Sequence, residues 1–140
     1  MSLSINDFFK CPFALDRLHN CGYLSSYLNP FAEWMEKQQF EDFTIRSHIS
    51  NVAHLSHSLN GIKPDIEDLS DHIQSFLFKH IPTCKCKGWK QGRQTREVSN
   101  SLNRFKDYLL IAMAWILNLK IWRIQKSTMN IFAGFLKNLN

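Results

Sequence analysis

The sequence predicts an all-α protein, and two observations carry the prediction. Apolar residues recur at helical spacing in two long stretches, and Gly or Pro residues separate these stretches from their neighbours. The chain has 140 residues, of which 44% are hydrophobic and 13% aromatic, which suffices for one domain with a modest core. We therefore expect several helices packed around a single core.

The amino-terminal part is predicted to hold a short helix and the start of a longer one. Ser4 and Asp7 have the spacing of a capping box, which opens a short amphipathic segment. Gly22 marks a break in the pattern. Asn29 and Pro30 then predict a helix start, because Pro tolerates the first helical position and Asn can cap the free amides.

The clearest helix is predicted to begin with Thr44 as its N-cap and to stop near Gly61. Its apolar positions are spaced 4, 3, 3 and 4 residues apart: Ile45, Ile49, Val52, Leu55 and Leu59. A different face is expected to be polar and available, and it carries Ser47, Asn51, His54 and Ser58. This second face is a candidate binding surface.

Two further helices are predicted, with a basic loop between them. Ser70 is expected to cap one helix that ends before Pro82, and the next helix is expected to start near Thr95. Residues 83–96 hold two glycines and five positive charges without apolar periodicity, which predicts a flexible loop. Beyond the loop, apolar positions are spaced 4, 3 and 4 residues apart: Val98, Leu102, Phe105 and Leu109.

Residues 110–140 have a different character. The segment from Leu110 to Trp122 is apolar but broken by Asn118 and Lys120, and it is shorter than the roughly 20 residues of a membrane helix. We therefore predict a helix that packs within the protein or against another chain. A peripheral membrane segment is the alternative. The aromatic stripe is interpreted as core, and it consists of Phe31, Trp34, Phe76, Phe105, Trp115 and Trp122.

Charge is divided unevenly along the chain. Residues 1–82 hold six Lys or Arg against ten Asp or Glu, a net −4, whereas residues 83–140 hold eleven against two, a net +9. The basic half is a candidate surface for a polyanion, because Lys and Arg release counterions when they neutralise phosphates. Charge alone leaves DNA, RNA and an acidic membrane face open.

The four cysteines favour a reducing, cytoplasmic location. Their spacing is not that of a secreted disulfide framework, and the start of the chain lacks the charged and apolar regions of a signal peptide. Cys84 and Cys86, with His80 nearby, could form half of a zinc site, but no second ligand pair is clearly spaced for it. His54 and His57 on one helix also lack a third ligand, so we predict no metal and no cofactor.

The order of these segments resembles the opening of tyrosine recombinases and related transposases. The resemblance rests on the run from Gly22 to Met35, on Thr44-Ile45-Arg46, and on Cys84-x-Cys86 followed by a basic loop and a Val-x-x-x-Leu-x-x-Phe-x-x-Tyr-Leu helix. It covers residues 22–109 and implies a compact four- to five-helix bundle, the SAM-like core-binding domain. Residues 1–21 would then be an amino-terminal segment, and residues 110–140 a divergent helical tail.

The resemblance implies a DNA-binding module of a truncated tyrosine recombinase, an integrase or transposase, without strand cleavage. The family's chemistry uses a His-x-x-Arg pair and a later tyrosine nucleophile. No histidine here has Arg three residues on, and no tyrosine follows Tyr108. The implied partner is double-stranded DNA, with a full-length recombinase or a second copy of the chain as further candidates. A helical protein-interaction domain that associates through its apolar tail is the alternative.

Candidate DNA contacts fall in three groups. By the resemblance, the start of the long helix faces DNA, where free amides and the helix dipole suit phosphate. The basic loop can follow a phosphate backbone, and the last core helix adds two cations. The candidates in chain order are Thr44, Arg46, Ser47, Asn51, Lys85, Lys87, Lys90, Arg93, Arg96, Arg104 and Lys106.

Overall fold

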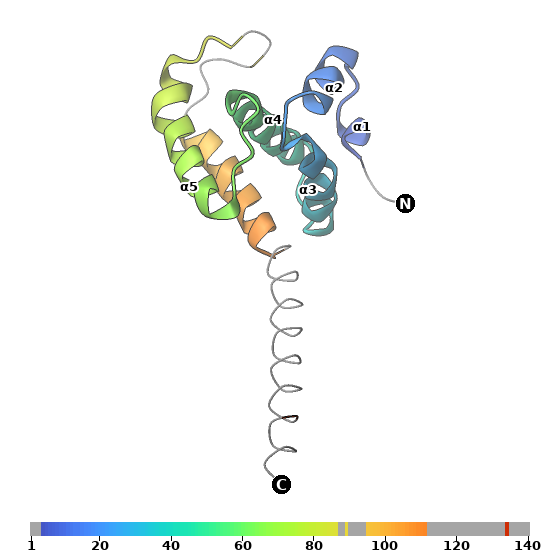
Figure 1. The fold of residues 1–140 in the computed structure, drawn as a ribbon. Helices are drawn as coiled ribbons and strands as arrows, with labels where there is room; N and C mark the ends of the chain where they lie inside the picture. Colours follow the sequence, from blue (N-terminus) through green and yellow to red (C-terminus); the bar gives the residue numbers. More distant parts are fainter. Residues whose placement is uncertain (1–3, 87–88, 90–94, 112–133, 135–140) are drawn as a thin grey trace. The chain divides into compact units, whose positions relative to one another are not determined.

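The computed structural model confirms the all-α prediction. It describes residues 4–86, 89, 95–111 and 134, and within these residues it contains helices and no strand (Figure 1). The chain divides into two compact units, Met1–Lys106 and Asp107–Asn140. The described part of the first unit includes residues 4–21, which the sequence had suggested as a segment of their own. Most of residues 110–140, including Trp115 and Trp122, lie outside the described residues.

The helices follow one another with short connections. Their bounds are α1 Ile5–Phe8, α2 Pro12–His19, α3 Ser25–Lys37, α4 Asp42–Ser58 and α5 Ile66–Ser75. The chain continues from α5 into a π-helical turn, η1 (Phe76–His80), and a 3₁₀ turn, η2 (Ile81–Thr83). A last described helix runs over residues 95–111. No helix in the described part of the chain is long and apolar enough to cross a membrane.

Helix α4 is the central element of the first unit. It contacts α1, α2, α3 and η1, and Figure 1 shows it in the middle of the bundle. The predicted apolar stripe of α4 is buried along its whole length, with Leu59 as its most exposed member at 5%. Helix α3 contributes Phe31, and the helix over residues 95–111 contributes Phe105; both rings are fully buried. Burial of these stripes is the main favourable term for the fold.

The predicted polar face of α4 is wrong at two positions. Asn51 is only 2% exposed and His54 only 4%, whereas Ser47 and Ser58 are half-buried. The reason is the central place of α4, which is covered on more than one side. The helix over residues 95–111 lies against it at Asn51, and the segment after η2 lies against it at His54. Both polar side chains are therefore internal groups with partners.

Three predicted helix starts are also wrong, because each helix begins earlier than its best capping residue. Pro30 lies inside α3, and Asn29 instead accepts a hydrogen bond from the Ile5 amide at 2.8 Å through its side-chain oxygen. Thr44 lies inside α4 and Ser70 inside α5. A capping bond contributes only about 1 kcal/mol, so a good capping residue does not by itself decide where a helix begins.

The capping box at Ser4 and Asp7 is confirmed. The Ser4 amide donates to the Asp7 carboxylate at 2.8 Å, and the Ser4 hydroxyl accepts from the Asn6 amide. The break predicted at Gly22 is confirmed as well, since this residue has a φ of +119° between α2 and α3. A local sequence pattern predicts structure well where the backbone conformation can be adopted by few residue types, as at a positive φ.

Candidate functional site

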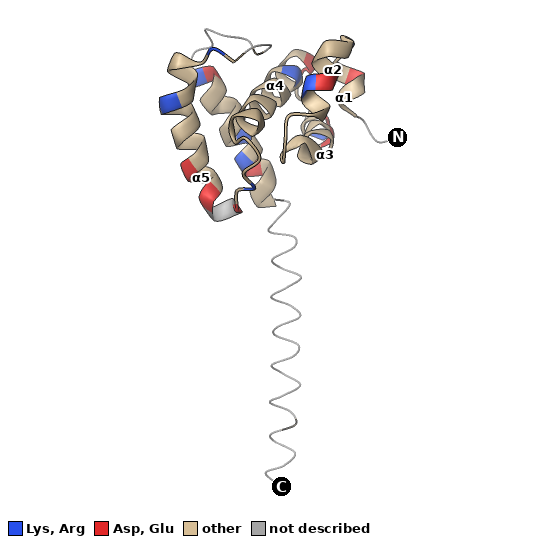
Figure 2. Cartoon of the chain, turned by 45° about the horizontal axis from the view of Figure 1, so that its top comes forward, with Lys and Arg blue, Asp and Glu red and all other residues tan. Residues whose placement is uncertain are grey.

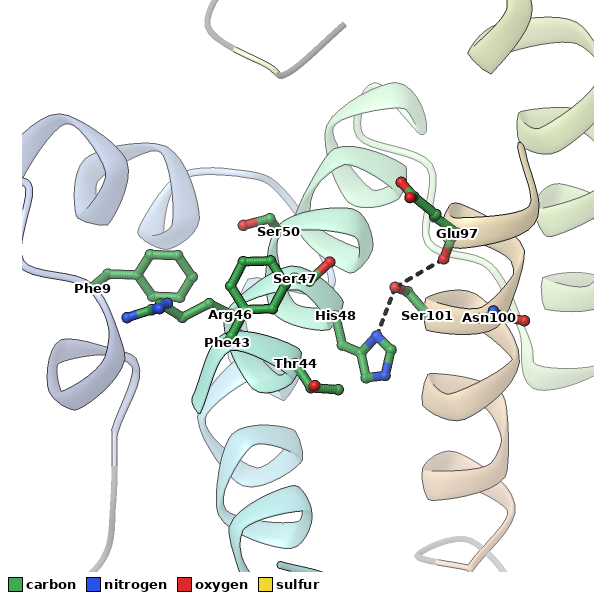
Figure 3. Close-up of a pocket in the computed structure, with 10 residues that line it drawn as sticks. All are labelled: Phe9, Phe43, Thr44, Arg46, Ser47, His48, Ser50, Glu97, Asn100 and Ser101. Carbon is green, nitrogen blue, oxygen red and sulfur yellow. Dashed lines mark hydrogen bonds between the residues drawn. The ribbon is translucent and has the colours of Figure 1, made fainter. Parts of the chain in front are cut away.

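Three of the predicted DNA contacts line one open pocket of about 530 Å³. Thr44, Arg46 and Ser47 come from the first turns of α4, and they share the pocket with Asn100 from the helix over residues 95–111 (Figure 3). The three α4 residues fall within four consecutive positions, about one helical turn, so they lie close together along the helix. Glu97 also lines the pocket and is an acidic group among its polar side chains.

A buried hydroxyl joins the two helices behind this pocket. The Ser101 side chain is fully buried, and its oxygen lies 2.7 Å from Nδ1 of His48 and accepts a hydrogen bond from Nδ2 of Asn51 at 2.8 Å. Ser101 also donates to the Glu97 backbone oxygen at 3.3 Å, and Figure 3 shows the contacts of Ser101 with His48 and Glu97. With the proton of His48 on Nδ1, the hydroxyl has two donors and one acceptor. Asn51 therefore links α4 to the helix over residues 95–111 behind the pocket, and its side chain is not at the surface.

Positive charge lies next to the pocket. The exposed Arg46 lines it, and the guanidinium of Arg104 stands 5.0 Å from the centroid of the Phe40 ring, which in turn meets the His48 ring edge-on. Burial lowers the pKa of His48, and the charge of Arg104 lowers it further. His48 is therefore neutral at neutral pH, and the fixed cations at this face are arginines.

The lowered pKa of His48 makes the stability of the protein depend on pH. The unfolded chain protonates this imidazole at its ordinary pKa of 6.5, whereas the folded chain takes up the proton only at lower pH. Unfolding therefore binds a proton between these two values, and stability falls as the pH drops through that window. We expect the free energy of unfolding of His48→Gln to fall less over this range than that of the unchanged protein. Denaturant titrations at pH 7.5 and at about pH 5 measure the difference; parallel losses in both proteins would contradict the prediction.

The other predicted cation contacts do not line the pocket, and three of them lie outside the described residues. Arg96 and Arg104 are exposed and Lys106 is half-buried, all three on the last described helix, while Lys85 is exposed in the segment after η2. Lys87, Lys90 and Arg93 lie outside the described residues. Acidic residues, by contrast, lie in the first turns of α5, where they are coloured red in Figure 2. The predicted cation contacts that can be placed thus belong to α4, the last described helix and the start of the basic loop.

A second site was missed from the sequence. The structure brings Cys84 and Cys86 together with His54 and His80, so that one ligand atom from each lies within 4.8 Å of all the others. Burial lowers the pKa of His80 and raises the pKa of the Cys86 thiol, which the neighbouring Cys84 raises further. The missing ligand pair consists of two histidines 26 residues apart. Only His80, four residues before Cys84, left a local signal in the sequence.

Comparison of the chain with protein-family models, with curated protein sequences and with solved structures found no match.

Proposed function

We propose that this protein is a helical module that binds double-stranded DNA, without cutting it, through the face formed by the start of α4 and the last described helix. The single observation that supports the proposal best is the shared pocket of Thr44, Arg46, Ser47 and Asn100. Hydroxyl, amide and guanidinium groups are the side chains that proteins use on phosphate oxygens. An open pocket lined by such groups from two helices suits an extended phosphate backbone better than it suits an enclosed small molecule.

Electrostatics supports the same proposal. Arg46 at the pocket and Arg104 beside it carry permanent charges, because the guanidinium stays protonated at every physiological pH. The long helix α4 begins at Asp42, so its free amides and positive dipole end lie near Thr44. The net +9 of residues 83–140 adds long-range attraction for a polyanion. The resemblance to recombinase core-binding domains points to the same ligand.

Salt dependence tests the proposal directly. A fluorescently labelled duplex should bind the full chain at low salt, with log K falling linearly as log salt concentration rises. Arg46→Ala and Arg96→Ala should each reduce the slope by about 1, because each removes one phosphate contact. Fluorescence anisotropy at four or five salt concentrations gives the slopes.

Lys63→Ala is the matched control, since Lys63 is an exposed cation beyond the opposite end of α4 from Arg46. Its slope should equal that of the unchanged protein. Absence of duplex binding at low salt would refute the proposed function. Equal slopes for Arg46→Ala and Lys63→Ala would show that binding uses another face.

A further inference from the structure

One ligand atom from each of His54, His80, Cys84 and Cys86 lies within 4.8 Å of the others, and three of the distances match the edges of a tetrahedral metal site. Nε2 of His54 lies 3.3 Å from Nε2 of His80 and 3.3 Å from Sγ of Cys84, and Sγ of Cys86 lies 3.4 Å from Nε2 of His80. Zinc bond lengths place two tetrahedral nitrogens about 3.3 Å apart, and a nitrogen and a sulfur about 3.6 Å apart. The observed distances agree with these edges to within a few tenths of an ångström.

We propose that these four residues bind one Zn²⁺ ion as a structural Cys₂His₂ centre. Two thiolates and two neutral imidazoles balance the charge of the ion, so the complete site is neutral and suits a partly buried place. Tetrahedral sulfur and nitrogen ligands favour zinc over the hard cations, which prefer oxygen. Four protein ligands fill the tetrahedron and leave no position for substrate, which is typical of a structural rather than a catalytic site.

The groups around the cluster hold the ligands in these positions. The Trp89 ring stacks on the His54 ring with 3° between their planes, and the Phe76 ring stacks on His80 at a centroid distance of 5.0 Å. The Cys86 amide donates to Sγ of Cys84 at 3.4 Å, an interaction that stabilises a thiolate. These contacts fix both imidazole rings with Nε2 toward the same point, as a metal requires.

The backbone of η1 contributes to this arrangement. Residues Phe76–His80 form a π-helical turn, and such turns are rare and are found frequently at functional sites. The wider turn shifts the register of the following residues relative to a continuous α-helix, and His80 is its last residue. The 3₁₀ turn η2 then leads directly into Cys84. A helix distortion and a short turn thus bring His80 and both thiols to His54, in the carboxy-terminal half of α4.

The zinc ion would tie the start of the basic loop to the central helix. His54 comes from α4, His80 from η1, and the two cysteines from the segment after η2. Because unfolded chains do not hold these ligands together, zinc binding should contribute directly to folding stability. This inference rests on the ligand geometry alone and is independent of the proposed DNA binding.

Cobalt titration of the full chain is the primary test. The protein is reduced, freed of metal and titrated with Co²⁺, which reports tetrahedral thiolate ligation by its visible absorption. We expect saturation at one equivalent, bleaching when Zn²⁺ is added, and a melting temperature that rises on the order of 10 °C with zinc in excess. Absence of a tetrahedral cobalt spectrum in the reduced, folded protein would overturn the proposal.

Two cysteine variants locate the site. Cys84→Ser/Cys86→Ser should lose the cobalt spectrum, whereas Cys11→Ser should keep it at one equivalent, because Cys11 is exposed and distant in sequence from the cluster. A spectrum that survives in the double variant would refute these ligands. Since the double variant could fail to fold, alkylation of the unchanged chain gives a second measurement. Zinc should protect Cys84 and Cys86 while Cys11 stays reactive, and equal labelling of Cys84 and Cys86 with and without zinc would contradict the proposal.

Discussion

Phe105→Ala is expected to lower the free energy of unfolding by about 3 to 5 kcal/mol, the usual cost of removing a fully buried aromatic ring. The Phe105 side chain is 0% exposed, and its ring meets Phe31 edge-on at a centroid distance of 5.1 Å and Tyr27 at 6.4 Å. These contacts attach the helix over residues 95–111 to α3. A loss of this size is a large fraction of the 5 to 15 kcal/mol that stabilise an ordinary domain.

Urea denaturation followed by circular dichroism measures this effect, and the chain supplies a matched control. Phe13 lies in α2 with 79% of its surface exposed, so Phe13→Ala should change the free energy of unfolding by no more than about 0.5 kcal/mol. Similar losses in the two variants would show that the last helix is not part of the core. Phe105→Ala should also disturb the wall of the pocket, because Ser101 lies on the same helix, one turn earlier.

Apolar periodicity was the most reliable guide to this fold. The stripe from Ile45 to Leu59 and the positions Val98, Leu102 and Phe105 are buried as expected, because burial on one helical face depends only on spacing along that helix. Capping residues were a poorer guide. Thr44 and Ser70 have good capping side chains, yet α4 and α5 begin before them. The free energy of a cap is small, and tertiary packing decides where the helix starts.

Polar residues on α4 were the hardest to interpret, because their environment is set by segments far away in the sequence. Asn51 meets Ser101, which is 50 residues later, and His54 meets Cys84, which is 30 residues later. Neither separation leaves a periodic or motif signal. The same limit explains why Cys84, Cys86 and His80 were noticed together but His54 was grouped with His57 instead: the four side chains meet only after α4 and η1 have packed.

The grouping of three α4 residues in one pocket was predictable for the opposite reason. Thr44, Arg46 and Ser47 lie within one turn, so their proximity follows from the helix itself. Only the second wall of the pocket, with Asn100 and Ser101, required the tertiary structure. Contacts between segments far apart in the sequence thus determine which polar residues of α4 are buried. Helical geometry determines which of its other polar residues lie close together.

Gly22→Ala is expected to destabilise the protein by about 2 kcal/mol or more, through two separate effects. The first is backbone strain, because a φ of +119° is a conformation that side chains rarely adopt. The second is steric: an added Cβ would stand 3.2 Å from Oγ and 3.3 Å from the backbone oxygen of Ser56 on α4. Ser56 cannot move freely, since it is 1% exposed and its Oγ accepts a hydrogen bond from the Leu24 amide at 3.0 Å.

Gly61→Ala separates the two effects. Gly61 also has a positive φ, +85°, but an added Cβ there meets no heavy atom within 4 Å. Its loss should therefore reflect backbone strain alone and stay below that of Gly22→Ala in thermal or urea unfolding. Equal losses would mean that α3 and α4 can move apart at Ser56 without cost. The larger loss at Gly22 would instead show that close backbone approach at this turn fixes where α3 starts, and with it the position of Phe31 against Phe105.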